Sequence, residues 1–305
     1  MYENLIKYKG IEWTDIAVPD KETVEKLYAK YNFHELDLED CLQGNQRSKI
    51  DEYENYLFIV LHFPYKIRKR MEVEELKMFI GPDYFITLHN GELKALEKMF
   101  QTVQEKLKER KEIMGSGTGY LLYEVVRALF DSCFPILDDI EDDINEIEKD
   151  VFDQEIHQRD MLKDIMQTKR NIITLYRMIV PQRAVVAQLE HKNKKFLPKD
   201  LEVYFDDVVD KAEKIYNSLE NFKALVQSLQ DTNESIISHN TNNIIKTLTI
   251  FSVTLLPLTL LSGIYGMNIS RLPYANDEMS FLILLGMMAA ITIVLLGFFK
   301  YKKWL

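Results

Sequence analysis

The sequence predicts an α+β domain joined through long stalk helices to a two-helix hairpin that spans a membrane. Three observations support this fold class. Strand-like and helix-like patterns are mixed in the first 90 residues, no Gly or Pro lies between Pro198 and Pro257, and two uncharged apolar runs lie near the C-terminus. The mean hydropathy of −0.19 fits a chain of 305 residues whose larger part is water-soluble.

The N-terminal part carries the signals of a small α/β domain. Helical patterns cover residues 24–31 and 35–42. Gly81-Pro82-Asp83 separates two apolar runs and predicts a hairpin turn between them. Strands are expected at residues 11–16, 56–63, 76–80 and 84–88.

From Gly91 onward the pattern is helical, with one turn expected at residues 115–119. Residues 138–150 combine a face of isoleucines with eight carboxylates on the remaining faces. This segment is either a solvated amphipathic helix or a source of negative potential that concentrates cations. The sequence leaves both interpretations open.

A long helix with a narrow apolar seam is predicted after Pro198. Steps of four and three residues between apolar positions are typical of a helix in a bundle or coiled coil. At 1.5 Å per residue, the stretch up to Pro257 is long enough for roughly 90 Å of helix. The seam consists of Val208, Ala212, Ile215, Leu219, Phe222, Val226 and Leu229.

Two membrane spans are expected, because residues 247–267 and 281–299 carry no charge and are each about 20 residues long. The N-terminus lacks the pattern of a cleavable signal peptide. Lysines flank the outer ends of the pair, whereas the connecting loop holds one arginine and two acids. The positive-inside rule therefore places both termini in the cytoplasm and the loop outside a cytoplasmic membrane. The lysines are Lys246, Lys300, Lys302 and Lys303.

These patterns divide the chain into seven segments. The segments are a cytoplasmic α/β domain (1–115), a helical hairpin with the acidic segment (116–197), a long stalk helix (198–246), a first transmembrane helix (247–267), an extracellular loop (268–280), a second transmembrane helix (281–300) and a basic cytoplasmic tail (301–305).

Composition excludes several functions. A formal charge of −10 argues against nucleic-acid binding, which needs a basic face. Cys41 and Cys133 are far apart and are interpreted as packing residues. The six histidines are scattered, without metal-ligand spacing or a nucleophile motif, so no enzyme is expected.

One face of the first span carries unusual polarity. Two spans per chain cannot enclose an aqueous path, so transport would require several subunits around this face. Ile245 and Leu248 would then form an apolar constriction, and the polar members would offer oxygens to a hydrated divalent ion. The alternative is that Ser and Thr only pack helices or bond back to the backbone. The expected pore-lining stripe comprises Asp231, Ser238, Asn242, Ile245, Leu248, Ser252, Leu256, Thr259 and Gly263.

Several motifs resemble the CorA family of magnesium channels, and the resemblance covers nearly the whole chain. The most specific motif is Tyr265-Gly266-Met267-Asn268 after an apolar helix. A second span with a terminal Lys302-Lys303-Trp304-Leu305 accompanies it. Further similar stretches are Leu38-Glu39-Asp40, Gln46-Arg47-Ser48-Lys49, residues 54–60, Tyr204-Phe205-Asp206-Asp207-Val208, Pro257-Leu258-Thr259 and Ser262-Gly263-Ile264.

The resemblance implies a funnel-shaped homopentamer with a central pore that passes Mg²⁺, and also Co²⁺ or Ni²⁺, without an organic cofactor. By position, Asn268 would form the selecting ring at the outer mouth, and Gly266 and Met267 would shape the turn. Asp40 and Asp207 match carboxylates of regulatory cation sites between subunits, through which internal Mg²⁺ closes the pore. Asp231, Asn242, Leu248 and Thr259 match family pore positions.

Two positions depart from the family pattern. Ile245 replaces a Met that is common at this pore position, and Leu272-Pro273-Tyr274-Ala275 replaces Met-Pro-Glu-Leu in the loop, with Asp277 and Glu278 arriving later. A zinc transporter on the same scaffold is one alternative, although those relatives usually have another residue at the Met of the Gly266-Met267-Asn268 triplet. A membrane-anchored sensor or scaffold without a pore is the other.

Overall fold

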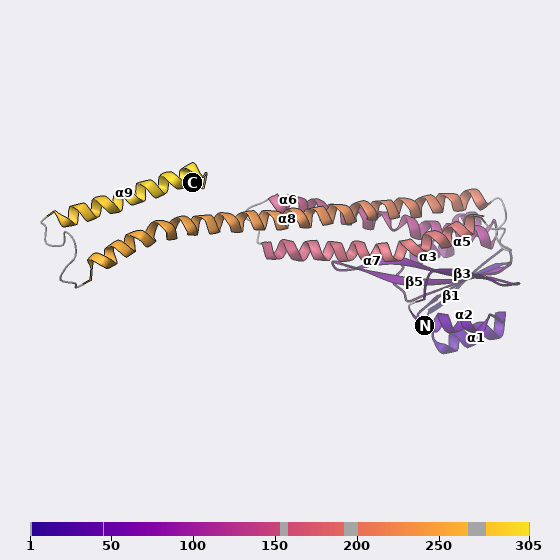
Figure 1. The fold of residues 1–305 in the computed structure, drawn as a ribbon. Helices are drawn as coiled ribbons and strands as arrows, with labels where there is room; N and C mark the ends of the chain where they lie inside the picture. Colours follow the sequence, from indigo (N-terminus) through magenta and orange to yellow (C-terminus); the bar gives the residue numbers. More distant parts are fainter. Residues whose placement is uncertain (1, 45, 153–157, 192–200, 268–278, 305) are drawn as a thin grey trace. The chain divides into compact units, whose positions relative to one another are not determined.

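The computed structural model describes residues 2–44, 46–152, 158–191, 201–267 and 279–304. Two compact units are present, residues 1–230 and residues 231–305. The first unit contains a sheet with helices on both faces (Figure 1). The second contains the apolar C-terminal helices.

The sheet of the first unit has six strands in the order β1-β2-β6-β5-β4-β3. Neighbouring strands are antiparallel except for the parallel pair β2 and β6. The four expected strands correspond to β2, β4, β5 and β6, whereas β1 and β3 were not expected. The bounds are β1 (Tyr2–Tyr8), β2 (Ile11–Ala17), β3 (Lys49–Glu52), β4 (Leu57–Ile67), β5 (Arg70–Ile80) and β6 (Tyr84–His89).

The expected hairpin between β5 and β6 is confirmed. Lys77 pairs with Leu88 in the antiparallel register, and the Gly81 amide donates to the Tyr84 carbonyl oxygen at 2.9 Å. A Cβ on Gly81 would collide with the Tyr84 ring, so the turn requires a residue without a side chain at this position. The turn therefore fixes which residues of β5 face each side of the sheet.

Helices α1 (Lys21–Tyr31) and α2 (Glu35–Leu42) cover one face of the sheet (Figure 1), and both were expected. Asp20 caps α1 by accepting from the Thr23 amide at 2.9 Å. Apolar side chains of both helices and of alternate strand positions form one buried cluster. It contains Ile16, Val24, Leu27, Phe33, Leu38, Cys41, Tyr56, Phe58, Val60, Phe79, Ile86 and Leu88.

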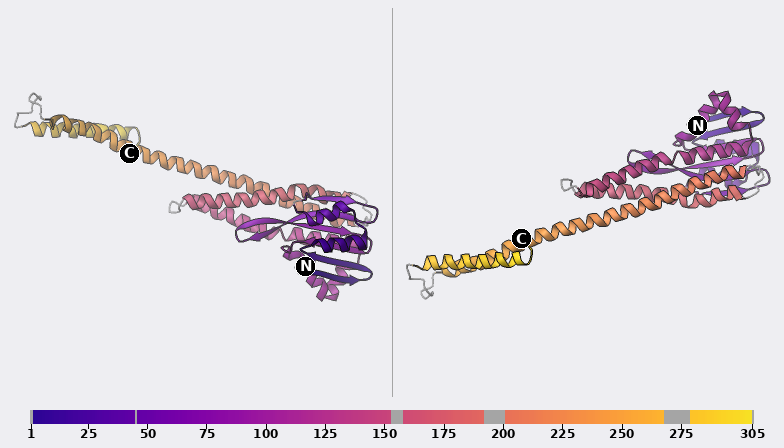
Figure 2. Two further views of the ribbon diagram at one scale, coloured as in Figure 1. Left: turned by 90° about the horizontal axis from the view of Figure 1, so that it is seen from below. Right: turned by 90° about the horizontal axis from the view of Figure 1, so that it is seen from above.

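The opposite face of the sheet is covered by α3 (Lys94–Glu105), α5 (Thr118–Asp131) and α7 (Gln158–His191), as the views of Figure 2 also show. Trp13 of β2 meets Phe100 of α3 edge to face at 4.8 Å between ring centroids. Helix α4 (Leu107–Met114) precedes the expected turn before α5. The predicted packing role of both cysteines is supported, since Cys41 and Cys133 are buried.

The first unit also contains α6 (Phe134–Phe152), α7 and the N-terminal part of α8 (Glu202–Tyr265), up to Gln230. The isoleucine face of α6 is buried, so its amphipathic character is confirmed. The α8 seam is buried from Val208 to Val226, while Leu229 is half-buried. Arg183 of α7 fastens α8 by two 2.7 Å hydrogen bonds to the Glu213 carboxylate. Its guanidinium also lies 4.0 Å from the Tyr216 ring centroid.

The second unit holds the C-terminal part of α8 and helix α9 (Ser280–Tyr301). Both helices contain a stretch long and apolar enough to cross a membrane, and none of either stretch is buried in the chain. Leu248, Leu256 and Leu260 of α8 are 64% exposed or more, as are Phe281 and Ile293 of α9. Exposed apolar surface on this scale requires lipid or partner chains around it. The two expected spans are thereby supported.

Candidate functional site

The expected pore-lining residues lie on one exposed face of α8. Helix α8 is continuous through Tyr265, although Pro257 lies inside it, so residues three and four apart remain neighbours on its surface. Ile245 is 54% exposed and Leu248 is 65% exposed, which leaves the proposed constriction open to other chains. All nine residues are exposed: Asp231, Ser238, Asn242, Ile245, Leu248, Ser252, Leu256, Thr259 and Gly263.

Threonine hydroxyl groups of this segment bond back to the helix. The Oγ1 atoms of Thr249, Thr254 and Thr259 donate to carbonyl oxygens one turn earlier, at 2.7, 2.7 and 2.9 Å. This agrees with the alternative interpretation, in which such residues only bond back to the backbone. It also has a chemical consequence on the stripe. Because the Thr259 hydroxyl donates its proton to the Leu255 carbonyl oxygen, the hydroxyl oxygen can act only as a hydrogen-bond acceptor. Water molecules bound to a cation point their hydrogens outward and need such acceptors.

The helix end that precedes the triplet is capped tightly. The amide of Gly266 donates to the Ser262 carbonyl oxygen at 2.9 Å, and the Met267 amide donates to the Ile264 oxygen at 3.2 Å. A Cβ on Gly266 would lie 3.0 Å from the Ser262 oxygen, so glycine allows the closest approach here. Asn268 and the loop up to residue 278 lie outside the described residues.

Asp40 and Asp207, the expected regulatory carboxylates, lie on α2 and on the first turns of α8. The side chain of Asp40 is 20% exposed and pairs with Lys49 at 2.8 Å. The side chain of Asp207 is 53% exposed and lies 3.6 Å from Lys211. Within the described residues of one chain, no group of three or more His, Cys, Asp or Glu side chains could hold a metal.

The acidic face of α6 lies over the β4–β5 turn. Lys66, Lys69, Asp143, Glu146 and Asp150 line a cavity of about 100 Å³ there. Burial raises the pKa of the Asp143 carboxyl even though both lysines oppose the shift. The lysines offset part of the acidic charge, so a role of this face in attracting cations stays a prediction.

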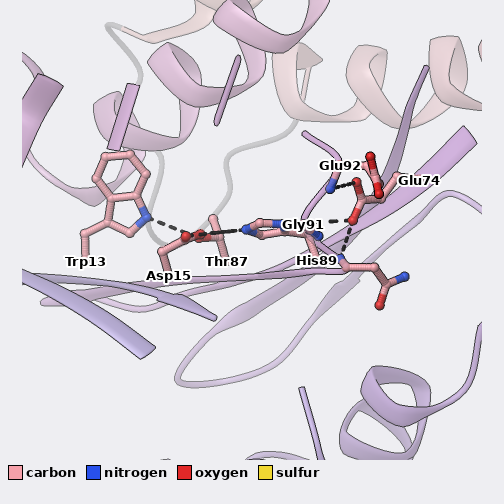
Figure 3. A network of polar contacts seen from close by, with 8 residues as sticks. Trp13, Asp15, Glu74, Thr87, His89, Gly91 and Glu92 are labelled. Carbon is pink, nitrogen blue, oxygen red and sulfur yellow. Dashed lines mark hydrogen bonds and ion pairs between the residues drawn. The ribbon is translucent and has the colours of Figure 1, made fainter. Parts of the chain in front are cut away.

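Sequence reasoning missed a buried polar chain between β2 and β6 (Figure 3). The Trp13 indole N–H donates to Thr87 Oγ1 at 3.3 Å, and the Thr87 hydroxyl donates to Asp15 Oδ1 at 2.6 Å. His89 Nε2 lies 3.2 Å from the same oxygen. Burial alone would lower the pKa of His89, but the Asp15 carboxylate raises it.

The same network of polar contacts continues to Glu74 of β5. The Gly91 amide donates to His89 Nδ1 at 3.0 Å, and the amides of Asn90 and Glu92 donate to the Glu74 carboxylate. Burial raises the pKa of this carboxyl. These bonds hold the segment between β6 and α3, and they are internal to the first unit. This hydrogen-bonded network is therefore interpreted as structural.

Asp37 is a further buried carboxylate that the sequence did not indicate. It lies one turn before Asp40 on α2, and it accepts from the Tyr56 hydroxyl at 2.7 Å and from the Tyr53 hydroxyl at 3.2 Å. Burial raises the pKa of this carboxyl. The tyrosines follow 16 and 19 residues later, a spacing that carries no recognisable signal.

Comparison with known proteins connects these features. The family described as CorA-like Mg²⁺ transporter protein matches residues 8–302. The cobalt/magnesium transport protein CorA of Thermotoga maritima is 31% identical over 98% of this chain and 83% of its own length. The solved CorA magnesium transporter of Methanocaldococcus jannaschii superposes with a TM-score of 0.84 at 22% identity, covering 98% of this chain and 94% of that one.

Similarity also extends to a zinc protein. The zinc transport protein ZntB of Yersinia enterocolitica is 24% identical over 62% of this chain and 57% of its own length. The match to the CorA-like family, in contrast, spans both the sheet domain and the two apolar helices. The chain is therefore a membrane transporter of divalent cations, not an enzyme, and it belongs to the family of CorA-like Mg²⁺ transporter proteins.

Proposed function

We propose that the chain is a subunit of a homopentameric channel that takes up Mg²⁺ across the cytoplasmic membrane. The observation that carries this proposal is the exposed stripe of α8, where polar and apolar residues alternate in blocks between Asp231 and Gly263. Several copies can place this face around a common axis, whereas one chain cannot enclose a path for water. Membrane potential drives the cation inward.

The ion passes with much of its water retained, because Mg²⁺ dehydrates reluctantly. Asn268 is the selecting residue at the outer mouth, and Gly266 and Met267 set its position. Acceptor oxygens such as that of Thr259 then receive hydrogen bonds from the hydration shell. Size and oxygen contacts discriminate poorly among similar hydrated cations, so Co²⁺ and Ni²⁺ are secondary substrates.

Ile245 and Leu248 form the gate. Their apolar side chains are exposed on the stripe. A ring of these side chains from several subunits blocks ions when water leaves the constriction. Asp40 and Asp207 form the sensor, in which Mg²⁺ bound between subunits on the cytoplasmic side holds the gate shut. Both termini face the cytoplasm, as the lysines at the ends of the two spans favour.

A matched pair of asparagines tests the stripe. Asn242 lies on it, and its exposed neighbour Asn243 points away from it on the next helical position. Asn242→Ala removes a polar group from the path and is expected to lower Mg²⁺ flux about twofold to tenfold. Asn243→Ala is the control and should leave flux unchanged. Flux is measured with a Mg²⁺-sensitive dye inside liposomes that contain the full-length protein.

Two further variants test the mouth and the gate in the same assay. Asn268→Ala should reduce flux, and Leu248→Asp should keep the constriction wet and conducting at high internal Mg²⁺. If both variants insert normally and conduct like the wild type, the chain is not a channel of this kind. A non-conducting sensor or scaffold would then be the better description.

Zinc is the competing cargo, favoured by the similarity to the zinc transport protein ZntB. The intact Gly266-Met267-Asn268 triplet favours magnesium. The same liposomes separate the two cations when Mg²⁺ and Zn²⁺ are offered in turn, with and without a pH gradient. Zn²⁺ flux that depends on the pH gradient and exceeds Mg²⁺ flux would contradict the magnesium assignment.

A further inference from the structure

Both carboxylates of the proposed sensor already have a cationic partner in their own chain. Lys49 Nζ lies 2.8 Å from Asp40 Oδ2, and Lys211 Nζ lies 3.6 Å from Asp207 Oδ2. A divalent cation that binds these oxygens must therefore displace an ammonium group. The importance of this competition rests on the proposed role of Asp40 and Asp207 as the sensor.

Lys49 is held firmly. Its ammonium bridges Asp40 at 2.8 Å and Asp51 at 2.7 Å, and it lies 5.1 Å from the centroid of the Phe58 ring. Its side chain is 31% exposed, so water screens these contacts only in part. Burial alone would lower the pKa of Lys49, but the hydrogen bonds to both carboxylates raise it above its ordinary value. The ammonium therefore stays charged throughout the physiological range.

Lys211 holds Asp207 more loosely. Its ammonium lies 2.6 Å from Asp131 Oδ1 of α5, and its contact with Asp207 is 1 Å longer. These three residues line an open groove of about 650 Å³ between α5 and α8. Burial alone would lower the pKa of Lys211, and the Asp131 carboxylate raises it. Asp207 remains accessible, because its side chain is 53% exposed.

An ammonium and Mg²⁺ compete for the same oxygens. A lysine offers three donors and one charge, whereas Mg²⁺ brings two charges but keeps several of its waters. The lysine gains from its tether, because short flexible links give effective concentrations on the order of millimolar. Mg²⁺ must therefore exceed a threshold concentration before it displaces the lysine.

We propose that Lys49, with a smaller contribution from Lys211, is a tethered competitor that sets the internal Mg²⁺ concentration at which the channel closes. In the absence of bound Mg²⁺, the lysines neutralise the sensor carboxylates within each subunit. Binding of Mg²⁺ between subunits releases them. The lysines thus raise the closing threshold without contacting the ion.

The test measures Mg²⁺ flux through the full-length protein in liposomes while Mg²⁺ on the cytoplasmic-domain side is titrated. Lys49→Gln should lower the Mg²⁺ concentration for half-inhibition about threefold to tenfold, as expected for removal of two partly buried ion pairs. Lys211→Gln should lower it less, by roughly twofold. Lys49→Arg keeps the charge and should stay near the wild-type midpoint.

Lys30→Gln is the matched control. It removes the same charge from the same domain and breaks an ion pair of 2.7 Å, but that pair is with Glu12 on β2. Its midpoint should equal that of the wild type. If Lys49→Gln behaves like Lys30→Gln, competition is excluded. If Lys49→Gln raises the midpoint instead, the lysine positions Asp40 for the ion, and the proposal is overturned.

A separate comparison tests the sensor on which the proposal rests. Asp40→Ala combined with Asp207→Ala should abolish inhibition by Mg²⁺ in the same liposomes. If inhibition persists unchanged in that double variant, the sensor lies elsewhere and the lysine proposal falls with it. If inhibition is lost there while Lys49→Gln leaves the midpoint unchanged, only the lysine proposal fails.

Discussion

Glu75 illustrates how strongly the sheet domain depends on single charges. Its side chain is 12% exposed, accepts from the Gln46 amide at 2.9 Å and pairs with Lys77 at 3.0 Å. His62 Nε2 lies 3.8 Å away. Burial alone would raise the pKa of Glu75, but the contacts with His62 and Lys77 lower it from 4.5 to about 2. The ionised form is therefore the one that stabilises the fold.

Glu75→Gln is expected to reduce the free energy of unfolding by about 2–3 kcal/mol at pH 7. A carboxylate with a lowered pKa stabilises fully above its ordinary pKa, near 4.5, and loses this contribution as pH falls toward 2. The difference between variant and wild type should thus shrink on acidification. Urea unfolding of the full-length protein in detergent, followed by circular dichroism at several pH values, measures it.

The control is Glu25→Gln on the exposed side of α1, which removes the same charge and should change stability by less than about 0.5 kcal/mol. A difference between Glu75→Gln and wild type that stays constant from pH 7 to pH 3 would contradict the assigned pKa.

Individual contacts were the least predictable part of the molecule. Asp15 and His89 are 74 residues apart, and only the parallel pairing of β2 with β6 brings them together. Asp40 and Lys49 are close in sequence, but their pairing depends on the path from α2 into β3, a strand too short and polar to be expected. Resemblance to the family thus identified Asp40 as a candidate, and the sequence did not indicate its ion pair with Lys49.

Among the elements, α8 offers a direct test of its buried seam. Leu219 is fully buried in the first unit, whereas Leu225 on the same helix is 51% exposed. Leu219→Ala should cost about 2–5 kcal/mol of unfolding free energy, because it leaves a cavity in a packed core. Leu225→Ala, the same chemical change, should cost less than about 1 kcal/mol. Thermal unfolding of both variants in detergent, against the wild type, provides the comparison.

Equal effects of the two leucine changes would mean that Leu225 is covered by another chain or that the seam is packed differently. A larger effect at Leu225 would contradict the seam assignment.

Periodicity predicted the elements well where one pattern prevailed. The β5–β6 hairpin followed from its Gly-Pro-Asp turn, and the seam of α8 followed from its spacing. β1 was missed because Tyr2–Tyr8 carries no regular alternation to mark a buried face. The first transmembrane helix was expected at residues 247–267, which include Pro257. In the structure α8 continues past this proline to Tyr265, as helices at membrane depth tolerate proline.

At the scale of the whole molecule, the exposed apolar surface of the second unit demands partners. Native mass spectrometry of the detergent-purified protein should give the mass of five 36.0 kDa chains. The physical reason for an oligomer is that the α8 stripe must face other copies of itself to form a path, and the number five comes from the resemblance to the family. A stable monomer or dimer that conducts Mg²⁺ after reconstitution would contradict the pentamer.

The pentamer, the cargo and the sensor could not be derived from the residues alone. Hydropathy and charge predict two spans with a polar stripe. Nothing in the described part of one chain specifies how many subunits bring their stripes together around the path. Those parts came from resemblance, whereas the spans and the exposed face of α8 follow from physical chemistry that any reader of the sequence can apply.

The burial of Trp13 gives the molecule an optical label. Trp13 is fully buried beside Phe85 and Phe100, and its indole N–H is bonded to Thr87. The only other tryptophan, Trp304, is 42% exposed and stacks on Phe299 at the end of α9. The two emission spectra therefore differ in colour, and replacing either indole by phenylalanine isolates the other. Each single-tryptophan variant therefore reports on one region alone, the sheet domain through Trp13 or the end of α9 through Trp304.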